Sequence, residues 1–305
     1  MIRQRSILVV LLLSGCSSPY GADDGRADDA PPRREVDAGS SATDAGIPEA
    51  TPDAGADAAT DPCEPACEAG FVCKAGACVR PASCAEWRAV DASPSGLRTI
   101  ADATTGEQQV YCDMETDGGG FTLLMRISAG VSGDPFTILT GAPRNDGVAA
   151  QITPFVTSDH YVSRLVARWG NGLAPEKVRA HVYDAGKVQK VALEFSGSES
   201  TPTTFFAASR LISSPWTDVG TPTFFSASGD PGNKRRFFIG RGYQTCETDT
   251  GWLLLRGSRG LLDPQPACGY ELPADRVRIF YAAGATATTW SGPHGEGSSF
   301  AIFVR

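Results

Sequence analysis

The placement of nine cysteines constrains this chain more than any other feature of its sequence. Cys16 stands alone near the N-terminus, and the other eight fall between positions 63 and 268. These eight are Cys63, Cys67, Cys73, Cys78, Cys84, Cys112, Cys246 and Cys268. An even number of cysteines in an exported chain indicates a disulfide framework. A zinc site among the four cysteines of residues 63–78 is the competing interpretation.

The first sixteen residues have the layout of an export signal. Arg3 and Arg5 precede an apolar run over residues 7–13, which is too short to remain in a bilayer as a helix, and small residues lead to Cys16. This stretch resembles a bacterial lipoprotein signal, which implies that Cys16 is lipidated and anchors the chain in a membrane. No aspartate follows Cys16, which by the same resemblance favours the outer membrane and cell surface. An ordinary signal peptide with a chance cysteine is the alternative.

Residues 17–62 predict a disordered linker. The segment consists mainly of Ala, Asp, Gly, Pro, Ser and Thr, and Asp-Ala-Gly recurs from positions 37, 44 and 53. It cannot bury enough apolar area to offset the entropy of ordering. The chain has a formal net charge of −8, and eleven of its acidic residues but only three basic ones fall in this linker. The remaining chain carries no basic patch, so we do not expect nucleic acid as a partner.

Residues 63–80 predict a small disulfide-rich module that resembles the EGF-like units of exported proteins. The spacing Cys-x3-Cys-x5-Cys-x4-Cys lies in a stretch too short to form a hydrophobic core, so disulfides must hold it together. Three pairings are open. A rigid spacer is the simplest role for such a module.

Residues 81–305 are long enough for one domain with its own core. Apolar alternation and β-branched or aromatic enrichment predict eight strands, near residues 109–111, 122–126, 178–183, 188–195, 236–239, 252–256, 276–281 and 300–304. One helix is expected over about 159–168, with Ser158 as its cap and Gly170 as its end. The pattern favours an α+β domain with mostly antiparallel, short strands and few helices.

One motif points to a family. Residues 111–121 read Tyr-Cys-Asp-Met-Glu-Thr-Asp-Gly-Gly-Gly-Phe, and Cys84 precedes Cys112 by 28 positions. This arrangement resembles the opening of a fibrinogen C-terminal-like recognition domain, although Phe121 stands where the family usually has tryptophan. The resemblance covers about residues 83–305 and implies disulfides Cys84–Cys112 and Cys246–Cys268. It also implies a domain that binds ligands rather than transforming them.

The C-terminal part is more similar to intelectin-type lectins than to vertebrate fibrinogen domains. Acidic residues follow the second cysteine region, Trp290-Ser291-Gly292 comes later, and the chain ends in Phe303-Val304-Arg305. The second disulfide would bring Glu247, Asp249 and Glu271 together. With carbonyls and water, three carboxylates are enough to bind calcium, and a sugar could complete the coordination. Solvated loop carboxylates are the alternative.

Several side chains are candidates for contact with a ligand. Trp290, Tyr243 and Tyr270 could stack on the apolar face of a sugar, whereas Trp252 lies within an apolar strand and is expected in the core. His294 and Glu296 could add ligands to a metal, although a solvated loop explains them as well. Of the other histidines, His160 is expected at the surface and His181 on a sheet face.

No signature of catalysis stands out. The sequence has no Gly-x-Ser-x-Gly elbow, His-Glu-x-x-His pair, phosphate-binding loop or dinucleotide fingerprint, and the cysteines are needed for disulfides. We therefore predict a surface lectin or adhesin that is not an enzyme. It would bind a glycan or acylated sugar on a surface or polymer with help from Ca²⁺. The alternative is a metal-independent module of the cell envelope that has a structural role or binds an extracellular protein.

Overall fold

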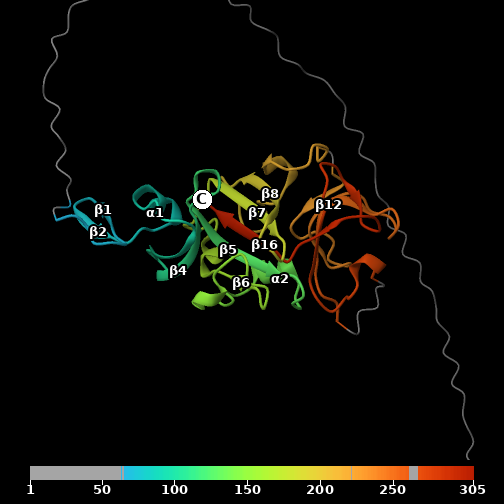
Figure 1. Ribbon diagram of the computed structural model, residues 1–305, viewed down its shortest axis with the longest axis horizontal. Helices are drawn as coiled ribbons and strands as arrows, with labels where there is room; N and C mark the ends of the chain where they lie inside the picture. Colours follow the sequence, from blue (N-terminus) through green and yellow to red (C-terminus); the bar gives the residue numbers. More distant parts are fainter. Residues whose placement is uncertain (1–62, 64, 221, 261–266) are drawn as a thin grey trace, which may run out of the picture. The chain divides into compact units, whose positions relative to one another are not determined.

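The computed structural model describes residues 63, 65–220, 222–260 and 267–305 (Figure 1). The predicted export signal, the predicted lipidation site at Cys16 and the predicted linker over residues 17–62 lie outside the described residues. In the part of the chain that the structure describes, no helix is long and apolar enough to cross a membrane.

The cysteine-rich module is a disulfide-held hairpin. Strands β1 (Val72–Lys74) and β2 (Ala77–Val79) pair antiparallel. Disulfides Cys63–Cys73 and Cys67–Cys78 close it, which selects one of the three pairings that the sequence left open.

The first large sheet has eight antiparallel strands. Its order is β3-β4-β5-β16-β7-β8-β9, and the short strand β6 also pairs with β5. The strands are β3 (Gly96–Asp102), β4 (Gly106–Asp113), β5 (Phe121–Ser128), β6 (Tyr161–Val162), β7 (Lys177–Tyr183), β8 (Gln189–Ser196), β9 (Leu211–Ser213) and β16 (Ser299–Val304). The last strand of the chain, β16, therefore lies in the middle of this sheet, between β5 and β7 (Figure 1).

The second large sheet has six antiparallel strands, and the disulfide Cys246–Cys268 joins two of its connecting segments. Its order is β10-β11-β12-β13-β15, and β14 pairs with β12. The strands are β10 (Phe224–Ser226), β11 (Arg235–Gly242), β12 (Thr250–Arg256), β13 (Arg278–Tyr281), β14 (Thr288–Thr289) and β15 (Gly295–Glu296). All eight predicted strands are present in the two sheets.

Helices are few and short. The two α-helices are α1 (Cys84–Val90) and α2 (Pro135–Thr140), and the 3-10 turns are η1 (Thr116–Gly118), η2 (Ala149–Gln151), η3 (Arg164–Arg168), η4 (Ala208–Arg210) and η5 (Gly269–Glu271). The Ser83 side chain caps α1 by accepting a hydrogen bond from the Glu86 amide. The expected α+β class, with mostly antiparallel strands and few helices, is confirmed.

Alternation along β16 divides the apolar side chains between two faces of the first sheet. Phe300, Ile302 and Val304 join the main core, which also includes side chains of the second sheet. Ala301 and Phe303 join a smaller cluster on the opposite face. Because side chains alternate along a strand, apolar side chains cover both faces of this sheet. Phe303, a member of the smaller cluster, also lines a cavity on that face.

The glycine run turns the chain between β4 and β5, as the motif implied. Gly118, Gly119 and Gly120 all have positive φ, which L residues with a side chain rarely adopt. A Cβ at Gly119 would lie 2.1 Å from the carbonyl oxygen of Met114. Only glycine can therefore make this turn without moving the backbone.

The helix expected over residues 159–168 is wrong. Tyr161–Val162 form strand β6, and only Arg164–Arg168 form a 3-10 turn, capped by Ser163 instead of Ser158. His160, expected at the surface, is fully buried. Its Nδ1 accepts a hydrogen bond from the Ser128 amide. The apolar residues that suggested one helical side instead serve a strand and a turn.

His181 lies on a sheet face, as predicted, and makes stability depend on pH. It is buried beside Tyr183, and burial first and then the Arg179 charge lower its pKa from 6.5 to about 4. The unfolded state thus binds a proton between these two values while the folded state does not. The free energy of unfolding will therefore fall by roughly 3 kcal/mol as the pH drops through this range.

Urea titrations at pH 7 and pH 4.5 measure this loss of stability, and His181→Gln should reduce it. The same change at His294, whose partly exposed ring lies on the other large sheet against Phe280, serves as the control. An equal loss in wild type and His181→Gln would contradict the assignment.

Candidate functional site

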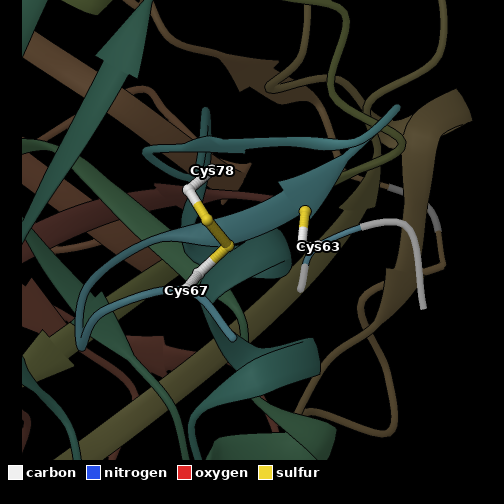
Figure 2. A group of neighbouring side chains, drawn as sticks. All are labelled: Cys63, Cys67 and Cys78. Atoms are coloured by element: carbon white, nitrogen blue, oxygen red, sulfur yellow. A yellow bond between two sulfur atoms is a disulfide. The ribbon is translucent and has the colours of Figure 1, made fainter. Parts of the chain in front are cut away.

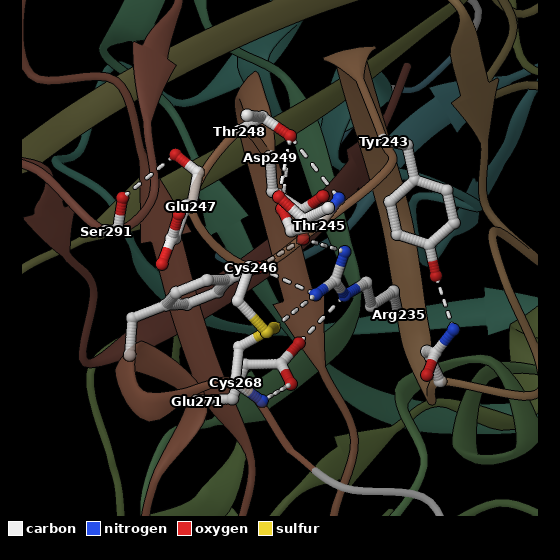
Figure 3. Close-up of a disulfide and its surroundings, with 12 residues drawn as sticks. Arg235, Tyr243, Thr245, Cys246, Glu247, Thr248, Asp249, Cys268, Glu271 and Ser291 are labelled. Carbon is white, nitrogen blue, oxygen red and sulfur yellow. Dashed lines mark hydrogen bonds and ion pairs between the residues drawn. A yellow bond between two sulfur atoms is a disulfide. The ribbon is translucent and has the colours of Figure 1, made fainter.

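A polar pocket lies beside the disulfide Cys246–Cys268, where the sequence placed the candidate site. The disulfide joins the segment before β12 to turn η5. A cavity of about 290 Å³ opens next to it, and Figure 3 shows the side chains around it. The lining residues are Asn233, Arg235, Tyr243, Gln244, Thr245, Cys246, Asp249, Cys268 and Glu271.

Arg235, the first residue of β11, lies at the centre of this site. Its side chain is 3% exposed and pairs with Asp249 at 2.7 Å and with Glu271 at 2.8 Å. Its Nη2 also donates to the hydroxyl of Tyr270 at 2.7 Å and to Cys268 Sγ at 3.5 Å. Figure 3 shows the guanidinium between the two carboxylate-bearing segments and the disulfide. One buried cation thus joins β11, β12 and η5.

The carboxylates are held from their other sides as well. Tyr270 donates its hydroxyl hydrogen to Asp249 at 2.8 Å, and the Cys268 amide donates to Glu271 at 3.0 Å. Burial alone would lower the pKa of Arg235, but its interactions with Glu271, Tyr270 and Asp249 raise that pKa above the ordinary value. Arg235 therefore carries a positive charge at every physiological pH.

The rim of the pocket is made of aromatic and amide groups. The Arg235 guanidinium lies 4.8 Å from the ring centroid of Tyr243, a cation–π distance. The Tyr243 hydroxyl donates to Asp230, and burial followed by this hydrogen bond raises the pKa of Tyr243 to about 12. Asn233 donates to Asp230 at 2.7 Å and accepts from Arg259 at 3.1 Å. These contacts fix the rim side chains in place.

The three carboxylates predicted to bind calcium are not arranged as a metal site. Asp249 and Glu271 do come together, but on Arg235, while Glu247 is exposed and its backbone oxygen accepts a hydrogen bond from Ser291. A calcium ion needs six to eight oxygens around it, and here a guanidinium occupies the space between two of the expected ligands. The residues at this position therefore do not fit calcium.

In the residues that the structure describes, one group of three or more Cys, His, Asp or Glu side chains lies close enough together to hold an ion. It consists of Cys63, Cys67 and Cys78. Figure 2 shows Cys67 bonded to Cys78, and Cys63 is bonded to Cys73. Disulfide sulfurs are not thiolate ligands, so this cluster is part of the disulfide framework.

The residues predicted to contact a ligand lie at different places in the structure. Tyr243 lines the pocket, and Tyr270 contributes its hydroxyl to the Arg235 network. The prediction that Trp290 stacks on a sugar is wrong. Its side chain is fully buried against Phe280 and offers no surface to a ligand. The sequence placed it in a Gly-rich loop, but the loop folds the indole inward.

His294 and Glu296 lie at a separate place, on and near β15. Glu296 is exposed and pairs with Arg278 at 2.7 Å, and His294 packs edge-on against Phe280. Neither residue lines the pocket beside the second disulfide.

The residue that sequence reasoning missed is Arg235. It lies in a Lys-Arg-Arg run, where a basic residue is normally solvated, and its partners are 14 and 36 positions away. Its position at the start of an apolar strand was the available signal, because an arginine that enters a core needs acidic partners.

Both disulfides of the large domain have the pairing that the family resemblance implied. Cys84 is bonded to Cys112 and Cys246 to Cys268. All eight cysteines from position 63 onward are thus in disulfides, which leaves no free thiol among them.

Comparisons with known proteins give similar solved structures only. No family model and no curated protein matches the chain. The fibrinogen-like globe domain of human ANGPTL6 is 14% identical, with 74% of this chain and 96% of that chain covered and a TM-score of 0.35. The globe domain of human ANGPTL2 is 13% identical, with 74% and 98% covered and a TM-score of 0.35.

The third structure is lamprey fibrin D-dimer, which was solved in complex with the peptide ligand Gly-His-Arg-Pro-amide. It is 12% identical, with 73% of each chain covered and a TM-score of 0.39. All three are fibrinogen-like domains.

Proposed function

We propose that this chain is a surface-anchored recognition protein that binds an extracellular glycan in the pocket beside Cys246–Cys268, without a metal ion. The observation that carries the proposal is the set of fixed polar groups around this cavity. Lipidation of Cys16 and the linker of residues 17–62 would hold the domain away from the membrane.

The lining of the pocket suits a sugar unit. Gln244 presents an amide, which both donates and accepts hydrogen bonds, and Thr245 presents a hydroxyl. Asn233 donates to Asp230 and Tyr243, so only its amide oxygen has capacity for a further hydrogen bond. Sugar hydroxyls need partners of both kinds. The cavity of about 290 Å³ lies at the lower end of ligand-site volumes, which favours a single terminal sugar or acylated sugar.

Arg235 takes the place that calcium was expected to have. A bound metal would have to displace a buried guanidinium that two carboxylates neutralise, at a cost of several kcal/mol. We therefore omit calcium from the proposal, and we place Arg235 as the residue that positions Asp249 and Glu271.

Glycan binding with and without chelator tests this proposal. On a glycan array, we expect the purified chain to bind selected glycans equally in calcium and in EDTA. Gln244→Ala should weaken that binding about fivefold to tenfold, which corresponds to one hydrogen bond. Gln109→Ala, an exposed position on β4, should leave it unchanged.

Two outcomes would contradict the proposal. Loss of glycan binding in EDTA would restore a metal-dependent mechanism. If no glycan binds and one extracellular protein is captured instead, the domain is a protein-binding module of the envelope.

A further inference from the structure

A second pocket lies on the face of the eight-stranded sheet that is opposite the main core. On β7, Val178, Ala180 and Val182 enter the main core. Arg179, His181 and Tyr183, which alternate with them, therefore point to the other face. Phe155, from the segment after η2, packs against the apolar cluster on that face. A cavity of about 210 Å³ remains between this segment and the sheet.

Aromatic rings form the walls of this cavity. Tyr111, Phe155 and Tyr183 all line it. The rings of Tyr111 and Phe155 are 6.3 Å apart at 87°, and those of Phe155 and Tyr183 are 5.2 Å apart at 82°. Because neighbouring rings are nearly perpendicular, a small ligand in the cavity would contact the face or the edge of at least one ring.

Two carboxylates lie at the same cavity. Asp113 is 6% exposed and accepts hydrogen bonds from the Glu115 and Thr116 amides and from Ser95. Glu115 is exposed and accepts from the Ser95 amide. Among the described residues, neither carboxylate has a basic side chain within ion-pair distance. Hydrogen bonds stabilise the Asp113 carboxylate, and the two acidic residues give the lining a net negative charge even with Lys187 present, which favours a cation in the cavity.

The titration of the cavity's tyrosines is consistent with a negative field. Burial first, then Asp113 and Glu115, raise the pKa of Tyr111 to about 12. Burial and then Asp113 likewise raise the pKa of Tyr183. Burial disfavours a charge of either sign, so only the part of these shifts that comes from Asp113 and Glu115 reflects a negative potential in the cavity.

Lys187 shows that the walls attract a cation. It lies on the exposed turn between β7 and β8, and its Nζ is 5.8 Å from the centroid of Phe155. This distance is near the outer limit of a cation–π contact, and Lys187 is itself one of the residues that line the cavity. It would repel or compete with a cation that enters.

We propose that this pocket binds a small organic cation, an alkylammonium group held by Tyr111, Phe155 and Tyr183 and balanced by Asp113 and Glu115. Only two carboxylates line this cavity, and in the described residues they are not part of any group of three or more acidic, histidine or cysteine side chains that could hold a metal ion. The aromatic rings that form the rest of the walls are not ligands for a hard metal ion, which requires oxygen. They do stabilise a large, weakly hydrated ammonium group. A trimethylammonium head group has this character. A lysine side chain is an alkylammonium of the same charge, but its ammonium group is compact and strongly hydrated.

Calorimetry with the full-length chain tests the proposal. Choline is the probe, and 3,3-dimethylbutan-1-ol, in which carbon replaces the nitrogen, is its neutral isostere. We expect choline to bind at least about tenfold more tightly than the isostere. Butylammonium is the second probe: tighter binding of choline indicates a trimethylammonium source, and tighter binding of butylammonium indicates a lysine side chain.

Variants give effects of opposite sign. Glu115→Gln should weaken choline binding roughly threefold, and Lys187→Met should strengthen it roughly threefold, because each changes one charge beside the pocket. Glu176→Gln, an exposed position outside the pocket, should have no effect. These exposed positions avoid the folding defect that Asp113→Asn could cause.

Equal affinity for choline and its isostere, no choline binding at millimolar concentration, or weaker binding in Lys187→Met would each overturn the proposal. The result is independent of the glycan pocket, because the two sites share no residue.

Discussion

Replacing Arg235 with methionine will lower the free energy of unfolding by about 3–5 kcal/mol, because the change leaves two buried carboxylates without their cation. Asp249 and Glu271 have 4% and 1% exposed side chains and both pair with Arg235. Urea denaturation followed by tryptophan fluorescence measures the loss, and the glycan pocket should lose its ligand in the same variant.

Two variants sharpen this experiment. Arg276→Met removes a solvent-exposed arginine that pairs with Asp275, and it should leave the free energy of unfolding nearly unchanged, because water screens an exposed ion pair. Adding Asp249→Asn and Glu271→Gln to Arg235→Met removes both stranded charges and should recover part of the loss. A loss below about 1 kcal/mol for Arg235→Met would mean that water reaches the carboxylates and that the site is not closed.

The second large effect is expected from the first disulfide. Cys84→Ala with Cys112→Ala opens a loop of 28 residues and should cost about 3–4 kcal/mol through the entropy of the unfolded chain. Both cysteines are fully buried and join α1 to β4. Thermal unfolding by calorimetry under oxidising conditions would show the lower midpoint.

Cys67→Ala with Cys78→Ala is the matched control, because it opens a loop of similar chemistry in the cysteine-rich module. We expect it to leave the main unfolding transition in place. If both double variants lower that transition equally, the module and the large domain unfold as one unit, and the loop-entropy account of the first disulfide fails.

The strands were predictable because their signal is local. Alternation in residues 178–183 or 300–304 follows directly from the two faces of a sheet, and the cysteine and glycine spacing of residues 84–121 implied the first disulfide and its turn. The helix over residues 159–168 failed because Tyr161, Leu165 and Val166 fit either a helical side or a short strand followed by a turn.

The sites were harder to predict because they depend on contacts between distant segments. Arg235 becomes a buried structural cation only because Asp249 and Glu271 pair with it in the folded chain. The residues next to Arg235 in the sequence do not predict these two ion pairs. The acidic residues were found, but their partner was taken to be a metal. The aromatic pocket brings together residues 111, 155 and 183, which lie on three separate segments and share no motif.

The central position of β16 has a consequence for how the domain assembles. The strand is the last one in the chain, yet it joins β5 to β7. Until it arrives, the two halves of the sheet each present an unpaired backbone edge, which is a template for association with other chains. A chain cut short before residue 299 should therefore aggregate instead of folding in part, which light scattering of the truncated protein would detect.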